Sequence, residues 1–406
     1  MKNKGPLSIY TLAVQGRYPT QPDEPQPATP PIVPTVGFIH STMQDADRAL
    51  GSAGGSVAHP EGYIYSRYGA PTQAAFEDAV ARLEEAEGAL SFSSGMAALH
   101  AVILAAVPAG GRIVAAQQVY GATHSLLGWL SNNLGITVYR GNFLDAEATG
   151  QLIREVQPQA VFCEIMTNPL VRVVRVDRII AAAREVGAVT VIDNTFTTPY
   201  LVCPLELGAT LVVHSATKFL NGHGDVLGGV VAGPLALLDR VREHRKVLGG
   251  MLGPFEAWLA LRGLRTLPLR MRQSCSSALA IAEWLTRQGR IERVWYPGLN
   301  GDPCHADACA LFQRGAFGAV LAFEIEGASQ EEAFAFVNHL RIIRPVTSLG
   351  DVNSLILHPA TSSHRALTAE ERAAQGIHQG TLRLSVGIED PDDLIADLEG
   401  AFRGIE

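Results

Sequence analysis

The most constraining feature of this sequence is a series of short apolar runs between Gly69 and Gly233. Most of the runs are hydrophobic throughout instead of alternating with polar residues, which indicates strands buried on both faces. Such strands need a layer of helices on each side of the sheet. The runs are Ile113–Ala116, Ile136–Tyr139, Ala160–Cys163, Val189–Ile192, Leu211–Val213 and Gly229–Val231, with helical patterns at Ala74–Glu87 and Asp177–Val186. The pattern predicts a mostly parallel α/β domain.

The 406-residue length favours two domains. After Pro254 the alternation of apolar runs and helical stretches ends, and we expect a smaller α+β domain over 251–406 beside an α/β domain over 61–250. Its expected elements are helices at Phe255–Gly263 and Ser274–Gln288, strands at Ala319–Ile325 and Leu382–Val386, and a last helix at Pro391–Phe402.

Residues 1–60 are predicted to form an irregular arm that contacts a neighbouring subunit. Closely spaced prolines disfavour long helices there, and Gly51–Gly55 is typical of a flexible loop. The prolines are Pro19, Pro22, Pro25, Pro27, Pro30, Pro31 and Pro34.

The bulk composition argues against several classes of partner. A net charge of −8 disfavours nucleic acid and anionic membranes. No secretory signal or bilayer-length apolar stretch is present. The five cysteines are odd in number and form no CxxC pair, so we expect reduced cysteines, no zinc site and a cytoplasmic protein.

Lysine is scarce, and Lys218 stands apart from the other three. It follows the apolar run Leu211–Val213 and precedes the glycine-rich Asn221–Gly224. A strand end that opens into small residues is where α/β sheets bind ligands. Taken alone, the same features also fit a surface lysine in a loop.

Two further elements point to an anionic cofactor. Ser93-Ser94-Gly95-Met96 opens a helical stretch, and backbone N–H groups at a helix start suit a phosphate. Asp193 ends a buried strand, where a carboxylate needs a cation or a donor and could hold a protonated pyridine nitrogen. Each is also consistent with an ordinary helix N-cap.

Several motifs together carry a specific resemblance that runs from about Pro31 to the C-terminus. They are Tyr65-Ser66-Arg67, Ser94-Gly95-Met96, Tyr120-Gly121-Ala122-Thr123, Val191-Ile192-Asp193-Asn194-Thr195, Ser215-Ala216-Thr217-Lys218, Ser348-Leu349-Gly350, His358-Pro359-Ala360 and Leu382–Gly387. In combination they resemble the Cys/Met-metabolism (transsulfuration) enzymes, which depend on pyridoxal 5′-phosphate (PLP) and have the aspartate-aminotransferase-like fold, PLP fold type I.

The resemblance implies a role for each matching residue. Lys218 would form an imine with the cofactor and shuttle protons, and Tyr120 would stack on the ring and assist proton transfer. The wider cofactor-binding set adds Asp193 at the ring nitrogen, Asn168 near the ring hydroxyl, and Gly95, Met96, Ser215 and Thr217 at the phosphate.

The resemblance also implies a shared active site. Tyr65 and Arg67 would reach the phosphate of the neighbouring subunit, in a dimer that pairs into a homotetramer. Arg383 would hold the α-carboxylate of a small amino-acid substrate, with Ser348 and Tyr65 nearby. No metal is implied.

The family performs both γ-elimination and γ-replacement, and departures from its pattern bear on the choice. Ser125 stands where cystathionine-handling relatives often have arginine, and Asp351–Ser354 lacks their glutamate. Ala122 replaces the cysteine that is common in methionine γ-lyases. Ala70 replaces an asparagine that is usual in the family, and nothing in the sequence explains this change. We expect a carbon–sulfur lyase that acts on methionine-like thioether amino acids. The alternative is a γ-replacement transferase, either an O-acetyl- or O-succinylhomoserine sulfhydrylase or a cystathionine γ-synthase.

Overall fold

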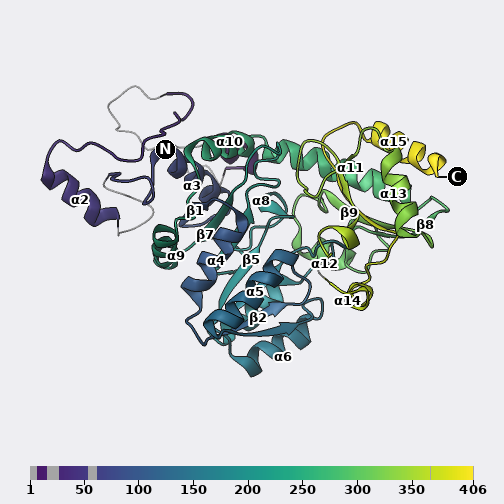
Figure 1. Ribbon diagram of the computed structural model, residues 1–406, viewed down its shortest axis with the longest axis horizontal. Coiled ribbons are helices and arrows are strands. Elements are labelled where there is room, and N and C mark those ends of the chain that lie inside the picture. Colours follow the sequence, from purple (N-terminus) through teal and green to yellow (C-terminus); the bar gives the residue numbers. More distant parts are fainter. Residues whose placement is uncertain (1–6, 16–26, 54–61, 366, 406) are drawn as a thin grey trace.

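A computed structural model describes residues 7–15, 27–53, 62–365 and 367–405 of the chain. The described residues form a large domain around a seven-stranded sheet and a smaller domain around a five-stranded sheet (Figure 1). In the described part of the chain, no helix combines the length and apolarity needed to cross a bilayer.

The large sheet has the strand order β1-β7-β6-β5-β4-β2-β3. Its strands are β1 (Gly88–Phe92), β2 (Arg112–Ala116), β3 (Thr137–Gly141), β4 (Ala160–Glu164), β5 (Val189–Asp193), β6 (Leu211–Ser215) and β7 (Gly229–Gly233). From β3 to β6 all neighbours are parallel, and β7 runs antiparallel to both β6 and β1. The mostly parallel sheet is therefore confirmed.

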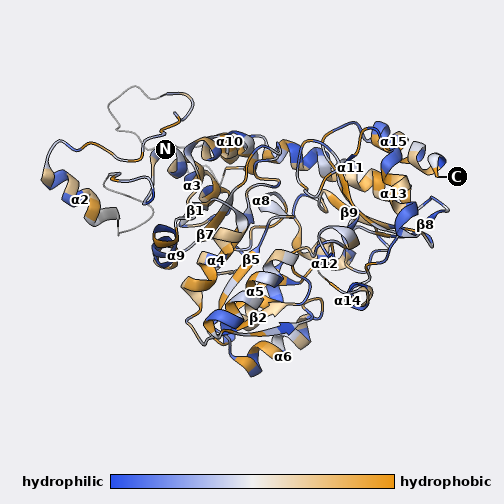
Figure 2. Cartoon of the chain, in the orientation of Figure 1, coloured by the Kyte–Doolittle hydropathy of each residue, from blue (hydrophilic) through white to orange (hydrophobic). Residues whose placement is uncertain are grey.

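Helices cover this sheet and supply its apolar layers. They are α3 (Pro71–Leu83), α4 (Gly95–Ala106), α5 (Gly121–Leu134), α6 (Ala146–Val156), α7 (Val176–Glu185), α8 (Thr198–Leu201), α9 (Leu235–Leu248) and α10 (Pro254–Leu264). Figure 2 shows apolar residues concentrated in the strands and in α4, while α9 presents a polar outer face. Because parallel strands all end at one edge, β4, β5 and β6 bring their last residues to the same place.

The smaller sheet has the order β10-β11-β12-β9-β8. Its elements are α11 (Leu267–Leu285), β8 (Ile291–Trp295), α12 (His305–Leu311), β9 (Val320–Ile325), α13 (Gln330–His339), β10 (Arg344–Pro345), β11 (Leu355–Leu357), a 3-10 turn (Pro359–Thr361), α14 (Ala369–Ala374), β12 (Thr381–Ser385) and α15 (Pro391–Gly404). Helix α11 joins both cores: Met271 and Cys275 pack in the large one, Ala278 and Ile281 in the small one. Residues beyond α11, such as Trp295 and Val320, also pack in the large core, so the two cores are not separated at one point of the chain.

The N-terminal segment is more helical than the sequence suggested. Helix α1 (Ile9–Val14) packs on α3 and α11 of its own chain, where Ile9 and Ala13 join the core. Helix α2 (Met43–Ala53) forms beyond the last proline of the cluster and extends away from the body (Figure 1).

The expected loop at Gly51–Gly55 is also different, because Gly51 lies inside α2. Gly54, Gly55 and the prolines Pro19, Pro22 and Pro25 lie outside the described residues.

Candidate active site

A cavity of about 450 Å³ opens where the carboxyl ends of β4, β5 and β6 meet the start of α4 and the loop before β11. Its volume is within the range of small-molecule sites. Except for Tyr65 and Arg67, every residue that the sequence predicted for the site lines this cavity. They are Gly95, Met96, Tyr120, Asn168, Asp193, Ser215, Thr217, Lys218, Ser348 and Arg383.

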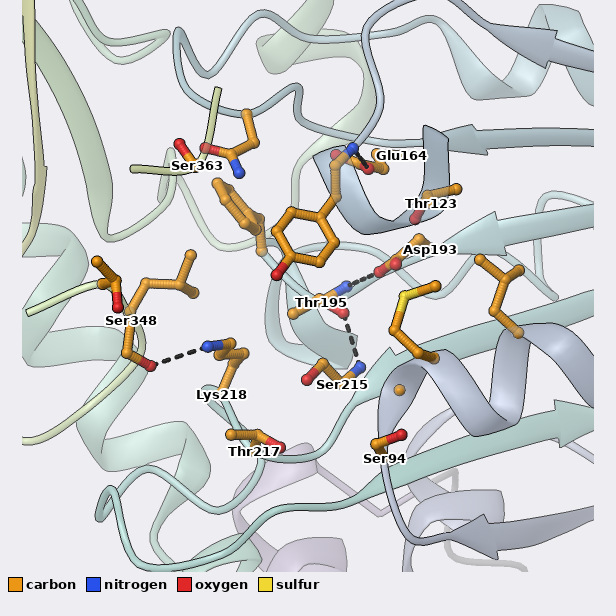
Figure 3. Close-up of a pocket in the computed structure, with 18 of the residues that line it drawn as sticks. Ser94, Thr123, Glu164, Asp193, Thr195, Ser215, Thr217, Lys218, Ser348 and Ser363 are labelled. Carbon is orange, nitrogen blue, oxygen red and sulfur yellow. Dashed lines mark hydrogen bonds between the residues drawn. The ribbon is translucent and has the colours of Figure 1, made fainter. Parts of the chain in front are cut away.

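Lys218 follows β6 and directs its amine across the cavity to the C-terminal domain. Its Nζ donates a hydrogen bond of 2.8 Å to Ser348 Oγ (Figure 3). Burial, together with the nearby positive charge of Arg383, lowers the pKa of Lys218 to about 8. The amine is therefore held in place and is easier to deprotonate than an exposed lysine.

Arg383 lies on β12 and is 3 % exposed. Its Nη1 donates to Asn168 Oδ1 at 2.9 Å and its Nη2 donates to the Ser348 carbonyl at 2.7 Å. Its Nε is buried and has no partner among the described residues. Burial lowers the pKa of Arg383 to about 10, so the side chain stays cationic at neutral pH. The Nε–Nη2 edge of a fixed guanidinium is suited to a carboxylate.

The opposite side of the cavity is built around the first turn of α4. Ser94 caps this helix, with its Oγ accepting from Ala97 N at 3.1 Å, and Gly95 begins it. A β-carbon at Gly95 would lie 3.0 Å from Ser215 Cα and Cβ, so a larger residue would push the start of the helix and β6 apart by a few tenths of an ångström. The hydroxyls of Ser215 and Thr217 and the N–H groups of α4 are thereby gathered at a site suited to an anion.

Asp193 ends β5 and faces the cavity, where its Oδ1 accepts from Thr195 N at 2.9 Å (Figure 3). Thr195 Oγ1 in turn accepts from Ser215 N at 2.9 Å, which links the ends of β5 and β6. Burial raises the pKa of Asp193. A cation placed against this carboxylate would compensate for its desolvation.

Glu164 is a cavity residue that the sequence analysis missed. It ends β4 directly beside Asp193 on β5, and its Oε1 accepts from Tyr120 N at 2.5 Å. Burial and the neighbouring Asp193 raise the pKa of Glu164 to about 8. The available signal was its position: like Asp193, it follows an apolar run directly.

Tyr65 and Arg67 do not line the cavity of their own chain. Arg67 Nη1 donates to the Lys246 carbonyl at 2.8 Å, and its guanidinium lies 5.4 Å from the centre of the Tyr65 ring. Tyr65 is 40 % exposed. Tyr65 is thus on the surface, and Arg67 is half-buried beside it.

Two of the unusual positions also lie outside the cavity lining. Ser125 Oγ donates to the Gly121 carbonyl within α5, at 3.1 Å. Asn353 Nδ2 donates to Asp351 Oδ1, at 3.1 Å. Neither supplies a charge to the cavity.

Known proteins resemble this chain over nearly its whole length. Residues 10–403 match the family described as Cys/Met metabolism PLP-dependent enzyme. An O-succinylhomoserine sulfhydrylase from Pseudomonas aeruginosa is 39 % identical, with 90 % of this chain and 88 % of the relative covered. An L-methionine γ-lyase from Treponema denticola is 40 % identical, with 92 % and 91 % covered. The crystal structure of cystathionine γ-synthase from Xanthomonas oryzae pv. oryzae, in complex with aminoacrylate and cysteine, superimposes with a TM-score of 0.90 at 36 % identity, with 99 % of each chain covered.

Proposed function

Because this chain belongs to the Cys/Met-metabolism PLP-dependent enzymes, we propose that it cleaves methionine-like thioether amino acids by γ-elimination. The products are a thiol, ammonia and a 2-oxo acid, with one water consumed. The large cavity is the proposed active site.

The residues of this cavity fit the family's cofactor. The N–H groups of α4 with Ser215 and Thr217 suit its phosphate, and the buried Asp193 carboxylate suits its ring nitrogen. Among the described residues that line the cavity, Lys218 is the one lysine. Bound PLP supplies a ring that accepts electrons and so stabilises negative charge at the substrate Cα.

Arg383 and Lys218 divide the work on the substrate. Arg383 would bind the α-carboxylate through its unpaired Nε edge, which fixes Cα relative to the Lys218 amine. Lys218, with its lowered pKa, would take the Cα proton as a neutral base. Loss of a Cβ proton then lets the γ-thiolate leave.

The preference for an uncharged thioether rests on the charges around the cavity. Among the described residues that line it, Lys218 and Arg383 are the only cations. A substrate such as cystathionine carries a second carboxylate, which would lie in the cavity without a cationic partner. The scarcity of cations is the observation that carries this proposal.

γ-Replacement is the second candidate. It shares the early proton transfers, and an O-succinylhomoserine sulfhydrylase and a cystathionine γ-synthase are among the similar proteins. In that reaction a thiol or sulfide replaces the γ-substituent of an O-acylhomoserine.

Product analysis separates the two candidates. With methionine or homocysteine alone, the purified enzyme should release ammonia and 2-oxobutanoate. If product forms only when an O-acylhomoserine and sulfide are supplied together, the enzyme is a transferase and the lyase proposal is wrong.

We further propose a homotetramer made of two active dimers, located in the cytoplasm. The exposed position of Tyr65, with the half-buried Arg67 beside it, supports a site completed by the neighbouring chain. Helix α2 supports the same assembly, because its Met43 and Leu50 are 79 % and 52 % exposed.

A further inference from the structure

A second cavity of about 330 Å³ lies beside the proposed active site. It is bordered by the loop that precedes α6, by the loop that carries Asn168, and by the end of α14 in the C-terminal domain. Asn168 lines both cavities. The proposed reaction gives this second space no role.

The charges of the second cavity are balanced. Of the described residues that line it, the charged ones are one cation, Arg172, and one anion, Asp145. Arg172 Nε donates to Cys304 Sγ at 3.5 Å, and Asp145 Oδ1 accepts from Ala148 N at 3.0 Å. Within the described part of the chain neither side chain forms a salt bridge, so each keeps capacity for a charged ligand.

The remaining lining combines amides with aliphatic groups. Gln118, Asn142 and Gln375 offer donors and acceptors, and the Gln118–Asn142 hydrogen bond is long at 3.4 Å. Leu144 and Leu170 supply apolar wall. A simple anion would be repelled by Asp145 and a metal cation by Arg172, whereas a zwitterion satisfies both.

We propose that this cavity binds a free α-amino acid with a short aliphatic side chain. Arg172 binds the carboxylate and Asp145 binds the ammonium group. Leu144 and Leu170 pack against the aliphatic side chain. The site is distinct from the one that holds the substrate.

Occupancy of this cavity acts on the active site through a short connection. Arg172 N donates to Thr167 Oγ1 at 3.1 Å. Arg172, which would bind the ligand, and Asn168 therefore lie in one loop that this hydrogen bond closes. Asn168 Oδ1 accepts from Arg383 at 2.9 Å. A ligand that fixes this loop therefore changes how firmly Arg383 is held, and the coupling between the two sites is reciprocal.

The test is calorimetric titration of the PLP-loaded enzyme with L-norleucine, which has the shape of methionine without its sulfur. Visible absorbance is followed in parallel. We expect each chain to bind one equivalent of L-norleucine that changes the absorbance and a second equivalent that leaves the absorbance unchanged. Only the identity of the first equivalent rests on the proposed function.

Two variants locate the second equivalent. Arg172→Gln and Asp145→Asn should each abolish it. The absorbance change should remain in both variants, with its midpoint shifted because the coupling between the two sites is lost. Asparagine retains the helix cap that Asp145 provides. Arg178→Gln, which changes an exposed arginine on α7, should keep both equivalents. The proposal is overturned if the silent equivalent is absent from wild type or persists in either variant. A third outcome would count against the proposed function alone. In it, L-norleucine binds the wild type without any absorbance change, and both variants lose this binding.

Discussion

At the scale of single residues, the proposed site works by placing ionisable groups where water cannot solvate them. Four ionisable residues are largely buried around one cavity: Lys218, Arg383, Asp193 and Glu164. Burial favours the neutral form of each, so it lowers the pKa of the two cations and raises the pKa of the two acids. For Lys218 this shift is useful, because a base must first lose its proton. For Arg383 it leaves the charge intact.

The lowered pKa of Lys218 predicts the pH dependence of the reaction. The Lys218 amine is free of the cofactor only while substrate is bound, and its neutral form is the active one, so kcat should rise about tenfold per pH unit below pH 8 and level off above it. The measurement is the initial rate of 2-oxo-acid formation across this range. A rate that falls as pH rises from 6 to 8 would contradict the assignment of Lys218 as base.

Arg383 should be sensitive even to a conservative change. Arg383→Lys keeps the charge and loses the paired donors, which should cost about 1.5–3 kcal/mol of substrate binding, or roughly a 10- to 100-fold loss in kcat/KM. Arg403→Lys serves as control, because this exposed arginine on α15 does not line the cavity. Equal kinetics for Arg383→Lys and wild type would remove Arg383 from substrate binding.

The raised pKa of Glu164 predicts how the free energy of unfolding depends on pH. Its folded pKa is raised, so the cofactor-free protein binds an extra proton at Glu164 between the ordinary glutamate pKa and about 8. The associated stability is present at low pH and is lost as pH rises through that window. Glu164→Gln removes the titration and can still accept from Tyr120 N. Urea unfolding of the cofactor-free protein at several pH values should therefore show a flatter profile for the variant, and an unchanged slope would contradict the assignment.

At the scale of elements, what the sequence reveals depends on burial. Strands β4 and β7 are fully buried and β6 is buried except at Ser215; each contains a continuous apolar run and was predicted within a few residues. Strand β8 was missed because only its last residue is buried at the sheet edge, and β10 because it spans two exposed residues. Glu164 was missed because the predicted β4 run ended at Cys163. The site motifs were readable because they follow strand ends.

Helix α4 allows its capping role to be separated from its proposed anion-binding role. Ser94→Ala and Ser329→Ala each remove an N-cap, from α4 and α13 respectively, and each should cost about 1 kcal/mol of stability. Only Ser94→Ala should also weaken PLP binding to the cofactor-free enzyme, because α4 borders the cavity and α13 does not. Matching PLP affinities in the two variants would argue against α4 as the phosphate site.

At the scale of the whole molecule, the two domains and a neighbouring chain are each proposed to contribute part of one site. The large domain supplies Lys218 and the C-terminal domain supplies Arg383. Arg67, near the surface of the large domain, is proposed to serve the cavity of the other subunit. Proposed sharing of this kind makes activity depend on assembly.

Subunit mixing tests this sharing directly. Lys218→Ala and Arg67→Ala should each be inactive or nearly so, but a hybrid dimer has one site with both residues intact. Co-refolding equal amounts makes half of the dimers hybrid, so about a quarter of wild-type activity should return. Mixing Lys218→Ala with Arg383→Ala is the matched control: both residues line the cavity of their own chain, every hybrid site carries one defect, and no activity should return. If the first mixture stays as inactive as the control, Arg67 acts within its own chain and the shared site is wrong.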